Sequence, residues 1–311
     1  MPLVVSTHHA CAGHLTLPGH PERPQRLEAA IAGAALAGAV PLDVEVDERR
    51  ALAAVARVHD PGLAERLREA CRRGPGLFDS PDNPISEGTY DAAVAAVAAA
   101  LAAADALVEG GSDGAWVPVR PPGHHALRDR AMGFCFFNNV AVAAEELLAR
   151  GLGPVAIVDF DVHHGNGTQA HFWSRADAFF LSLHHFPFYP GSGSAEEIGA
   201  GAGRGFTRNV PLAAGADDAI YTEALAMGLE DVLRTLTPRA WLVSAGFDPH
   251  VDDPLGGMAM TEAGFTAFGR LIRGAAGRAP VLAVLEGGYR LEALRTSVRA
   301  FLGGLEDRVT P

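Results

Sequence analysis

The sequence contains no lysine, and arginine alone supplies its 25 strongly basic side chains. Without a lysine amine the chain can form neither a Schiff base with a carbonyl substrate nor the lysine contact of a phosphate-binding loop. Cysteine is also scarce, because the chain has only Cys11, Cys71 and Cys135. An odd number of widely spaced cysteines indicates reduced thiols rather than a disulfide framework, so we expect a reducing, cytoplasmic compartment.

Positive charge is in deficit, since the net charge is −12 and the isoelectric point is near 5.5. This balance argues against nucleic acid as a ligand and mildly favours cationic partners. The N-terminus lacks the basic flank and continuous apolar core of a signal peptide. The alanine-rich stretch Ala92–Val108 is interrupted by Asp105 and reads as too weakly apolar for a membrane span, so we expect no membrane partner.

The 311 residues are 48% hydrophobic, can bury a large core, and are not divided by a Ser/Gly-rich linker or a charge run. We therefore expect a single catalytic domain over residues 1–311. From about Ala115 onward, apolar strand-like runs alternate with helical patterns at 87–108, 138–149, 217–238 and 261–274. This alternation predicts the α/β class, with a mostly parallel β-sheet and helices on both faces.

Carboxylates and imidazoles gather directly after the strand-like run Val155–Val158. Asp159, Asp161 and His163 alternate at period two, so in an extended chain their side chains leave the same side of the backbone. Oxygen and nitrogen ligands of this kind suit a divalent ion such as zinc, and a catalytic zinc takes three protein ligands. A third ligand is therefore needed, and Asp248, which follows the apolar run 241–246, is a candidate.

Two further apolar runs are followed by polar residues that could take part in catalysis. The run 114–120 leads to a turn with adjacent histidines, His124 and His125, and the run 280–285 leads to Glu286-Gly-Gly-Tyr289. In open parallel sheets ligands bind at the carboxyl ends of the strands. We therefore expect these four strand ends to converge on one pocket.

Seven motifs in order carry a resemblance to a known family: RPPGHH (120–125), MGFCFFNN (132–139), DFDVHHGNGT (159–168), SLH (182–184), GFD (246–248), DDPLG (252–256) and EGGY (286–289). Together with GHPERPQRL (19–27), the sequence resembles the zinc-dependent histone deacetylase family. It is similar to the class II branch, to bacterial histone deacetylase-like amidohydrolases and to acetylpolyamine amidohydrolases. The resemblance implies an arginase/deacetylase-like fold and the hydrolysis of acetyl or short acyl amides of lysine-like amines.

The resemblance also assigns roles to individual residues. It implies one zinc ion on Asp161, His163 and Asp248. It pairs His124 with Asp159 and His125 with Asn166. Because an asparagine cannot stabilise an imidazolium as a carboxylate does, we expect His125 to be the general base and acid and His124 an electrostatic partner. Tyr289 would donate a hydrogen bond to the oxyanion.

Further positions match the family's substrate and cation sites. The substrate-binding set is Gly133, Phe134, Tyr189, Leu255 and Asp82, with Arg26 near an internal channel. A potassium ion is implied at Asp159, Asp161, His163, Ser182 and Leu183. Tyr189 departs from the family, which commonly has phenylalanine there, so the expected tunnel is slightly more polar. Leu255 counts against acetylpolyamine specialists, which carry a glutamate at this place.

Three alternatives stay open beside an acetyl-lysine hydrolase. Acetylpolyamines are a second substrate within the same chemistry. An arginase-like ureohydrolase would need an Asp-x-His-x-Asp ligand pattern, but Asp161-Val-His163-His164 ends in histidine. A non-catalytic acyl-lysine binder is disfavoured by the presence of Tyr289 and both tandem histidines. The sequence leaves open the physiological substrate, the oligomeric state and the choice between zinc and iron(II).

Overall fold

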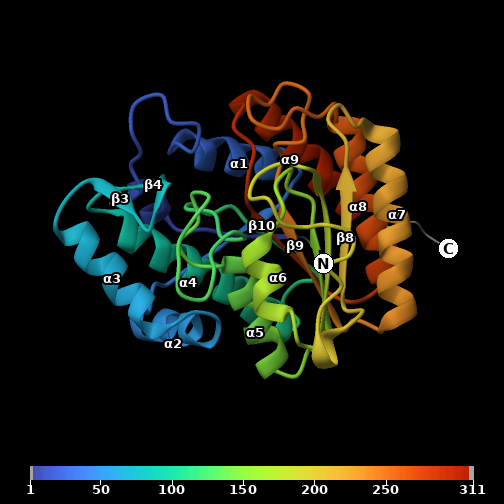
Figure 1. Cartoon of the computed structure of the whole chain (residues 1–311), viewed down its shortest axis with the longest axis horizontal. Helices are drawn as coiled ribbons and strands as arrows, with labels where there is room; N and C mark the ends of the chain where they lie inside the picture. The colour runs from blue at the N-terminus through green and yellow to red at the C-terminus, as the bar shows by residue number, and fades with distance from the viewer. Residues whose placement is uncertain (1–2, 308–311) are drawn as a thin grey trace.

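A computed structural model describes residues 3–307 and shows an eight-stranded sheet between two layers of helices (Figure 1). The strands lie in the order β2-β1-β5-β10-β9-β6-β7-β8, and all neighbouring pairs are parallel. Their bounds are β1 Val4–Ser6, β2 Val40–Leu42, β5 Gly114–Val117, β6 Val155–Asp159, β7 Ala178–His185, β8 Thr207–Leu212, β9 Ala240–Ala245 and β10 Val281–Leu285. A separate antiparallel pair is formed by β3 (Gly76–Phe78) and β4 (Ser80–Ile85).

Helices cover both faces of the large sheet, as the sequence predicts. One layer holds α2 (Glu48–Val58), α3 (Pro61–Arg72), α4 (Thr89–Val108), α5 (Asn139–Ala149) and the short α6 (Asn166–Phe172). The other holds α1 (Gln25–Leu36), α7 (Asp218–Thr235), α8 (Glu262–Ala276) and α9 (Leu291–Glu306). Figure 1 shows α2, α3 and α4 on the left and α7 and α8 on the right. The single-turn helices η1 (His9–Gly13) and η2 (Gly201–Gly203) lie in loops.

Successive residues of the central strands belong to different cores. Ile157 of β6 packs in the core under α4 and α5, whereas Val158 packs in the core under α7, α8 and α9. Leu242 and Val243 of β9 divide in the same way. A strand buried on both faces must be apolar at every position, which is why these strands appear in the sequence as continuous apolar runs.

Local signals explain where the predicted helices begin. Asp217 precedes α7, and its side chain accepts hydrogen bonds from the backbone N–H groups of Ala219 and Ile220. Thr261 caps α8 in the same way. Such caps satisfy backbone donors that have no partner inside the helix. Strands β1 and β2 are not among the predicted elements, because each has only three residues.

Helix α4 is strongly apolar, and its composition corrects one expectation. Within residues 3–307 it is the single helix that is long and apolar enough to cross a membrane by length and composition, whereas this stretch was expected to be too weakly apolar. Of its most apolar window, 72% is buried inside the protein. Its alanines let α4 pack closely against α5 and α2, so its composition is explained by a place in the core.

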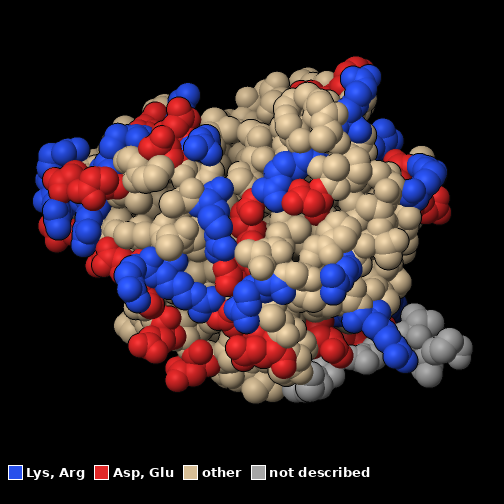
Figure 2. Space-filling model, turned by 90° about the horizontal axis from the view of Figure 1, so that it is seen from below, with Lys and Arg blue, Asp and Glu red and all other residues tan. Residues whose placement is uncertain are grey.

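Charged side chains of both signs are interspersed over the face shown in Figure 2. Ion pairs also connect helices at the protein surface, such as Arg50 of α2 with Asp105 of α4 at 2.6 Å. Exposed pairs of this kind contribute only about 0–1 kcal/mol each. This face therefore has no field of a single sign that would attract a polyanion.

Candidate active site

The predicted metal ligands, the tandem histidines and Tyr289 lie beyond the carboxyl ends of four strands that are neighbours in the sheet, β5, β10, β9 and β6. His124 and His125 follow β5, and Tyr289 follows β10. Asp248 follows β9, and the pair Asp161 and His163 follows β6. Parallel strands end at one edge of the sheet, so these segments, which span 165 positions of sequence, meet at one place.

Asp161, His163 and Asp248 offer three possible metal ligands within 4.8 Å of one another. His163 Nδ1 lies 3.1 Å from Asp161 Oδ1 and 3.2 Å from Asp248 Oδ2. Ligand atoms about 2.0–2.1 Å from a tetrahedral ion are about 3.3–3.4 Å apart, so these separations fit a single divalent cation. Both carboxylates are buried, and two buried carboxylates repel each other unless a cation lies between them.

Backbone hydrogen bonds hold the metal-ligating groups in place. Strand β6 ends at Asp159, so the period-two alternation explains the direction of only the first of the three side chains. After the strand, the N–H of Asp161 donates to Asp159 Oδ1 (3.1 Å), and the N–H of His163 donates to Asp161 Oδ1 (2.9 Å). The N–H of Val162 donates to Asp248 Oδ1 (2.9 Å). Each carboxylate is thus fixed before any ion binds.

Gly287 brings the β10 loop against the same two carboxylates. Its N–H donates to Asp161 Oδ2 at 2.7 Å. A Cβ atom at this position would lie 2.1 Å from Asp248 Oδ2 and 2.5 Å from Asp161 Oδ2. Only glycine therefore allows this close approach, which explains the first glycine of the EGGY motif.

The charges of the metal-ligating residues depend strongly on one another. Burial disfavours the charged form of His163, but Asp161 and Asp248 outweigh it and raise the pKa of the imidazole to about 9. Burial also opposes the charge of Asp161, yet His124 and His163 hold its pKa well below the usual range. The pKa of Asp248 is raised by burial and by the charge of Asp161. A divalent cation would take the place of the proton on His163 and would compensate the two buried negative charges of Asp161 and Asp248.

The tandem histidines have different partners and opposite pKa shifts. His124 Nδ1 lies 3.0 Å from Asp159 Oδ2, and His125 Nδ1 lies 2.7 Å from Asn166 Oδ1. Burial opposes the charge of His124, but Asp159 and Asp161 raise its pKa to about 10. Burial and the neighbouring His124 and His163 keep the pKa of His125 well below its usual value. At neutral pH His125 is a neutral imidazole beside a positively charged His124.

Tyr289 is 7% exposed and is held from both sides. Its ring meets Phe134 edge-on at 6.0 Å between centroids, and the guanidinium of Arg26 lies 4.8 Å from its centroid. The backbone N–H of Tyr289 donates to Asp253 Oδ2 at 2.6 Å. Burial raises the pKa of the phenol well above its usual value, so the hydroxyl keeps its proton and remains a hydrogen-bond donor.

Arg26 is completely buried, so it is not an ordinary surface charge. Its Nε donates to the Gly288 carbonyl (2.6 Å), and Nη2 donates to the Glu286 carbonyl (2.5 Å). The third side of the guanidinium pairs with Glu22 at 3.1 Å, and Glu22 also binds Arg120. Arg26 thus ties the N-terminal segment to the loop that carries Tyr289.

The expected tunnel residues lie around the tandem histidines. The ring of Tyr189 stands edge-on to His125 (5.1 Å between centroids) and to His163 (5.9 Å). Gly133, at φ 60°, packs against His125, and a Cβ there would lie 2.3 Å from the imidazole Cδ2. The phenol that distinguishes Tyr189 from the family's phenylalanine donates to Asp82 Oδ2 at 2.9 Å. Asp82 also accepts from the N–H of Gly133 (3.2 Å), so it connects two walls of the site.

The residues matched to a monovalent cation site share Asp161 and His163 with the metal-ligating group and add Asp159, Ser182 and Leu183 from β6 and β7. Asp159 of β6 is the register partner of Ser182 of β7, and both are fully buried. Leu183 is the next residue of β7 and is also buried. The Ser182 hydroxyl lies 2.9 Å from His184 Nδ1. The Asp159 carboxylate, the Ser182 hydroxyl and the backbone carbonyls of these strand residues thus lie at the same level of the sheet, on neighbouring strands.

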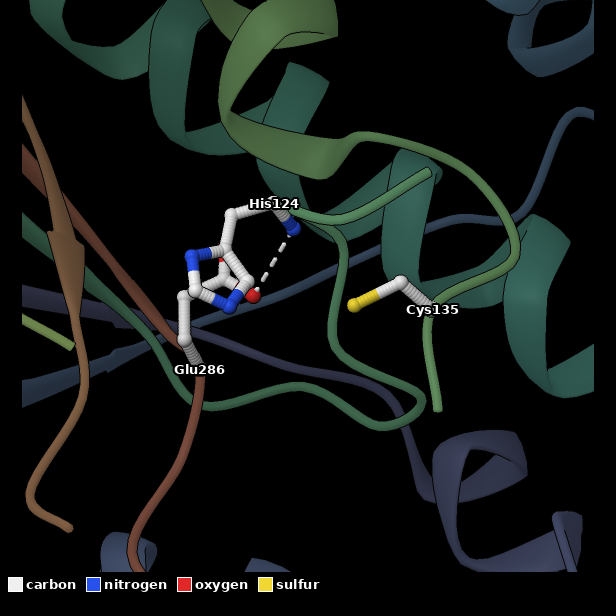
Figure 3. Close-up of side chains that lie close together, drawn as sticks. All are labelled: His124, Cys135 and Glu286. Carbon is white, nitrogen blue, oxygen red and sulfur yellow. Dashed lines mark hydrogen bonds between the residues drawn. The ribbon is translucent and has the colours of Figure 1, made fainter. Parts of the chain in front are cut away.

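Glu286 is a site residue whose role the sequence reading missed. Its carboxylate accepts hydrogen bonds from the N–H groups of Gly123 (2.7 Å) and His124 (3.1 Å), as Figure 3 shows for His124. The residue is fully buried, and its Oε1 has no hydrogen-bond partner among residues 3–307. Burial raises its pKa to about 7. Glu286 therefore holds the histidine turn, and the only signal in the sequence is an acid placed directly after an apolar strand.

Cys135 lies near His124 and Glu286, and the three could be taken for a second metal site (Figure 3). The imidazole nitrogens of His124 are directed at Asp159 (3.0 Å) and Asp161 (3.8 Å) instead. Burial raises the pKa of the Cys135 thiol well above its usual value, and the thiol donates a hydrogen bond to the Gly133 carbonyl at 3.3 Å. Within this cluster it is Glu286 that positions the histidine turn, through its two backbone hydrogen bonds.

Replacing Glu286 with alanine is expected to lower the free energy of unfolding by about 2–6 kcal/mol, because two buried N–H groups lose their acceptor at about 1–3 kcal/mol each. Urea unfolding followed by circular dichroism measures the change. Glu286→Gln is the matched control, since its amide oxygen can accept both bonds and we expect most of the stability to remain. Equal losses in the two variants would show that the charge, and not the acceptor, matters.

The fold and the site together define a parallel-sheet α/β protein with a buried carboxylate-and-histidine centre, suited to one metal ion, at the carboxyl edge of the sheet. The chain belongs to the histone deacetylase domain family, whose sequence model matches residues 20–305. Family membership implies a metal cofactor and decides against the ureohydrolase alternative.

Individual relatives show how close this membership is. The chain is 42% identical over 240 residues to the histone deacetylase-like amidohydrolase of Pseudomonas aeruginosa, which covers 75% of the chain and 62% of that relative. It is 43% identical over 224 residues to the acetylpolyamine amidohydrolase of Burkholderia pseudomallei, which covers 71% and 64%. The chain thus spans under two thirds of either relative. A crystal structure of acetylpolyamine aminohydrolase from Burkholderia pseudomallei matches with a TM-score of 0.87 and 32% identity, covering 97% of this chain and 98% of that one.

Proposed function

We propose that this protein is a zinc-dependent amidohydrolase that removes an acetyl or other short acyl group from a lysine-like amine. The observation that carries the proposal is the meeting of Asp161, His163 and Asp248 with a neutral His125 in one buried site. Two carboxylates and one imidazole leave a fourth position of a tetrahedral zinc ion open, which is typical of catalytic sites. We further propose that residues 1–311 act as one cytoplasmic domain.

When bound, zinc would polarise the acyl carbonyl and lower the pKa of a water molecule toward about 7. His125 is placed to handle the proton. The oxygen of Asn166 can only accept, so Nδ1 of His125 carries the hydrogen and Nε2 keeps a free lone pair. Nε2 takes a proton from the attacking water and later returns it to the leaving amine.

His124 and Tyr289 stabilise charge in this scheme. The pair of His124 with Asp159 keeps a positive charge beside the reacting carbonyl. Tyr289 keeps its proton at neutral pH and donates a hydrogen bond to the negative charge that develops on the carbonyl oxygen. Phe134 and Tyr189 exclude water and bind the methylene chain of the amine.

We also propose a potassium ion at Asp159, Asp161, His163, Ser182 and Leu183. The support is the burial of Asp159 next to Ser182 across the β6–β7 pairing. A monovalent cation there would offset buried negative charge and stiffen the residues that ligate zinc.

Two other functions are weighed against this one. Deacetylation of acetylpolyamines uses the same groups and is the activity in the names of two of the relatives. A non-catalytic acyl-lysine binder would not need two histidines that are each hydrogen-bonded to a polar partner, or a buried, protonated Tyr289. Both of these are present, so catalysis is favoured.

Turnover on a panel of acylated amines tests the proposal. The panel contains an acetyl-lysine peptide, N-acetylputrescine and longer acyl-lysines, and metal analysis is done on the same sample. We expect hydrolysis with one divalent ion per chain, loss of hydrolysis after chelation, and recovery on adding zinc. Full activity in the metal-free protein would refute a metal-dependent mechanism, and no turnover of any substrate by the zinc-loaded protein would leave the binder as the better description.

A further inference from the structure

Beside the catalytic groups lies a cavity of about 430 Å³. It is lined by the segment 19–23 before α1, by the loop 252–255, and by Tyr289 and Arg290 before α9. Tyr289, the proposed oxyanion donor, and Leu255, a residue of the expected substrate-binding set, both line this cavity. A molecule whose acyl amide reaches Tyr289 can therefore place its other end in the cavity.

Two arginines give this cavity its charge. Arg23 and Arg290 both line it, and both are exposed. Within residues 3–307 neither guanidinium has an ion pair or a side-chain hydrogen bond, whereas Arg26 and Arg120 nearby are bound to Glu22. The single carboxylate in the lining is Asp252. The cavity thus has an excess of positive charge in a chain whose net charge is −12.

Guanidinium groups without a partner in the protein have a preferred ligand. A planar guanidinium binds a carboxylate through two parallel N–H···O bonds, which adds geometric selectivity to the charge attraction. The same groups repel an ammonium group, and an acetylated polyamine carries one or more of these at the end away from its amide. The charges that line the cavity therefore favour an acylated amine that carries a carboxylate over an acetylated polyamine that carries an ammonium group.

We infer that the cavity between segment 19–23 and loop 252–255 binds a carboxylate of the substrate through Arg23 and Arg290. The substrate class is then an acylated amine whose chain ends in a carboxylate, such as an Nε-acetyl-lysine with a free α-carboxylate. This inference rests on the proposed function and adds a substrate preference to it.

Two substrates that differ in one group test the preference. Nα-Benzoyl-Nε-acetyl-lysine with a free carboxylate is compared with the same compound as the carboxamide, and N-acetylputrescine is the cationic third. The carboxylate is expected to show a kcat/KM roughly tenfold above that of the carboxamide, as one charge-assisted hydrogen bond supplies. N-Acetylputrescine is expected to be the poorest of the three.

Variants assign the preference to the arginines. Arg23→Gln and Arg290→Gln should each reduce the carboxylate-to-carboxamide ratio, and the double variant should bring it to about one. Asp252→Asn should raise the ratio, because it removes the opposing charge. Arg299→Gln is the matched control, since Arg299 lines a different cavity beside α8 and α9 and should leave the ratio unchanged.

A binding measurement separates this inference from the proposed function. Calorimetry on the His125→Ala variant, whose turnover is expected to be strongly slowed, gives Kd for both lysine compounds, and we expect the carboxylate to bind roughly tenfold tighter. Tighter binding of the carboxylate without hydrolysis by the wild type would overturn the function and keep the cavity assignment. Hydrolysis with equal kcat/KM for the two compounds, or a ratio that survives in the double variant, would overturn the cavity assignment and keep the function.

Discussion

Replacing His125 with alanine is expected to lower kcat by about 10²–10⁴-fold, the usual contribution of a positioned general acid and base. His125 is the histidine of the tandem pair whose surroundings keep it neutral, so it is the one able to take a proton at neutral pH. His124 cannot replace it, because Asp159 and Asp161 keep that imidazole protonated. Steady-state kinetics on an acetyl-lysine peptide, with metal content measured on both proteins, checks the loss.

A histidine outside the site provides the control for this variant. His171 lies on α6 with its imidazole 2.6 Å from Glu145, and His171→Ala should leave kcat unchanged. A His125→Ala protein that binds metal normally and keeps a wild-type kcat would show that another group moves the proton.

Replacing Tyr289 with phenylalanine is expected to lower kcat by about 10²–10³-fold, as the loss of one oxyanion donor does in other enzymes. The phenyl ring remains between Arg26 and Phe134, so substrate binding should change little and KM should stay nearly constant. The effect should therefore fall on kcat. Parallel measurement of kcat and KM makes the distinction.

Tyr90→Phe is the matched control, because the Tyr90 hydroxyl also makes one hydrogen bond, to Glu48 at 2.7 Å, but lies away from the site. It should leave kcat unchanged. A rise in KM with constant kcat in the Tyr289 variant would contradict the assignment, since it would mean that the hydroxyl binds substrate and transition state equally.

Much of the fold could be predicted because the parallel sheet is buried on both faces. Strands β6, β9 and β10 are continuous apolar runs followed by polar residues, and α7 has a side-chain cap at Asp217. The small strands β1 and β2 could not be recognised, because three residues show no periodicity. The order of strands was also out of reach, since apolar runs do not specify which neighbours they pair with.

The sequence predicted some site residues from their clustering alone and others only from the resemblance to a family. Asp161 and His163 stand out in the sequence because they gather at one strand end, and family resemblance supplied the partners Asp159 and Asn166. Glu286 was missed because its two hydrogen-bond donors lie more than 160 positions away. The bond from Tyr189 to Asp82 was missed for the same reason, since only the folded chain brings them together.

The position of β10 has a consequence for how this chain is synthesised. Because β10 pairs with β5 on one side and with β9 on the other, the large sheet consists of two separate pieces until residues 281–285 have left the ribosome. Each piece then presents an unpaired parallel strand edge, which is a template for association with other nascent chains. A chain in which β10 has not yet joined the sheet therefore exposes the unpaired edges of β5 and β9, and we expect chaperones to bind this intermediate in preference to the folded protein.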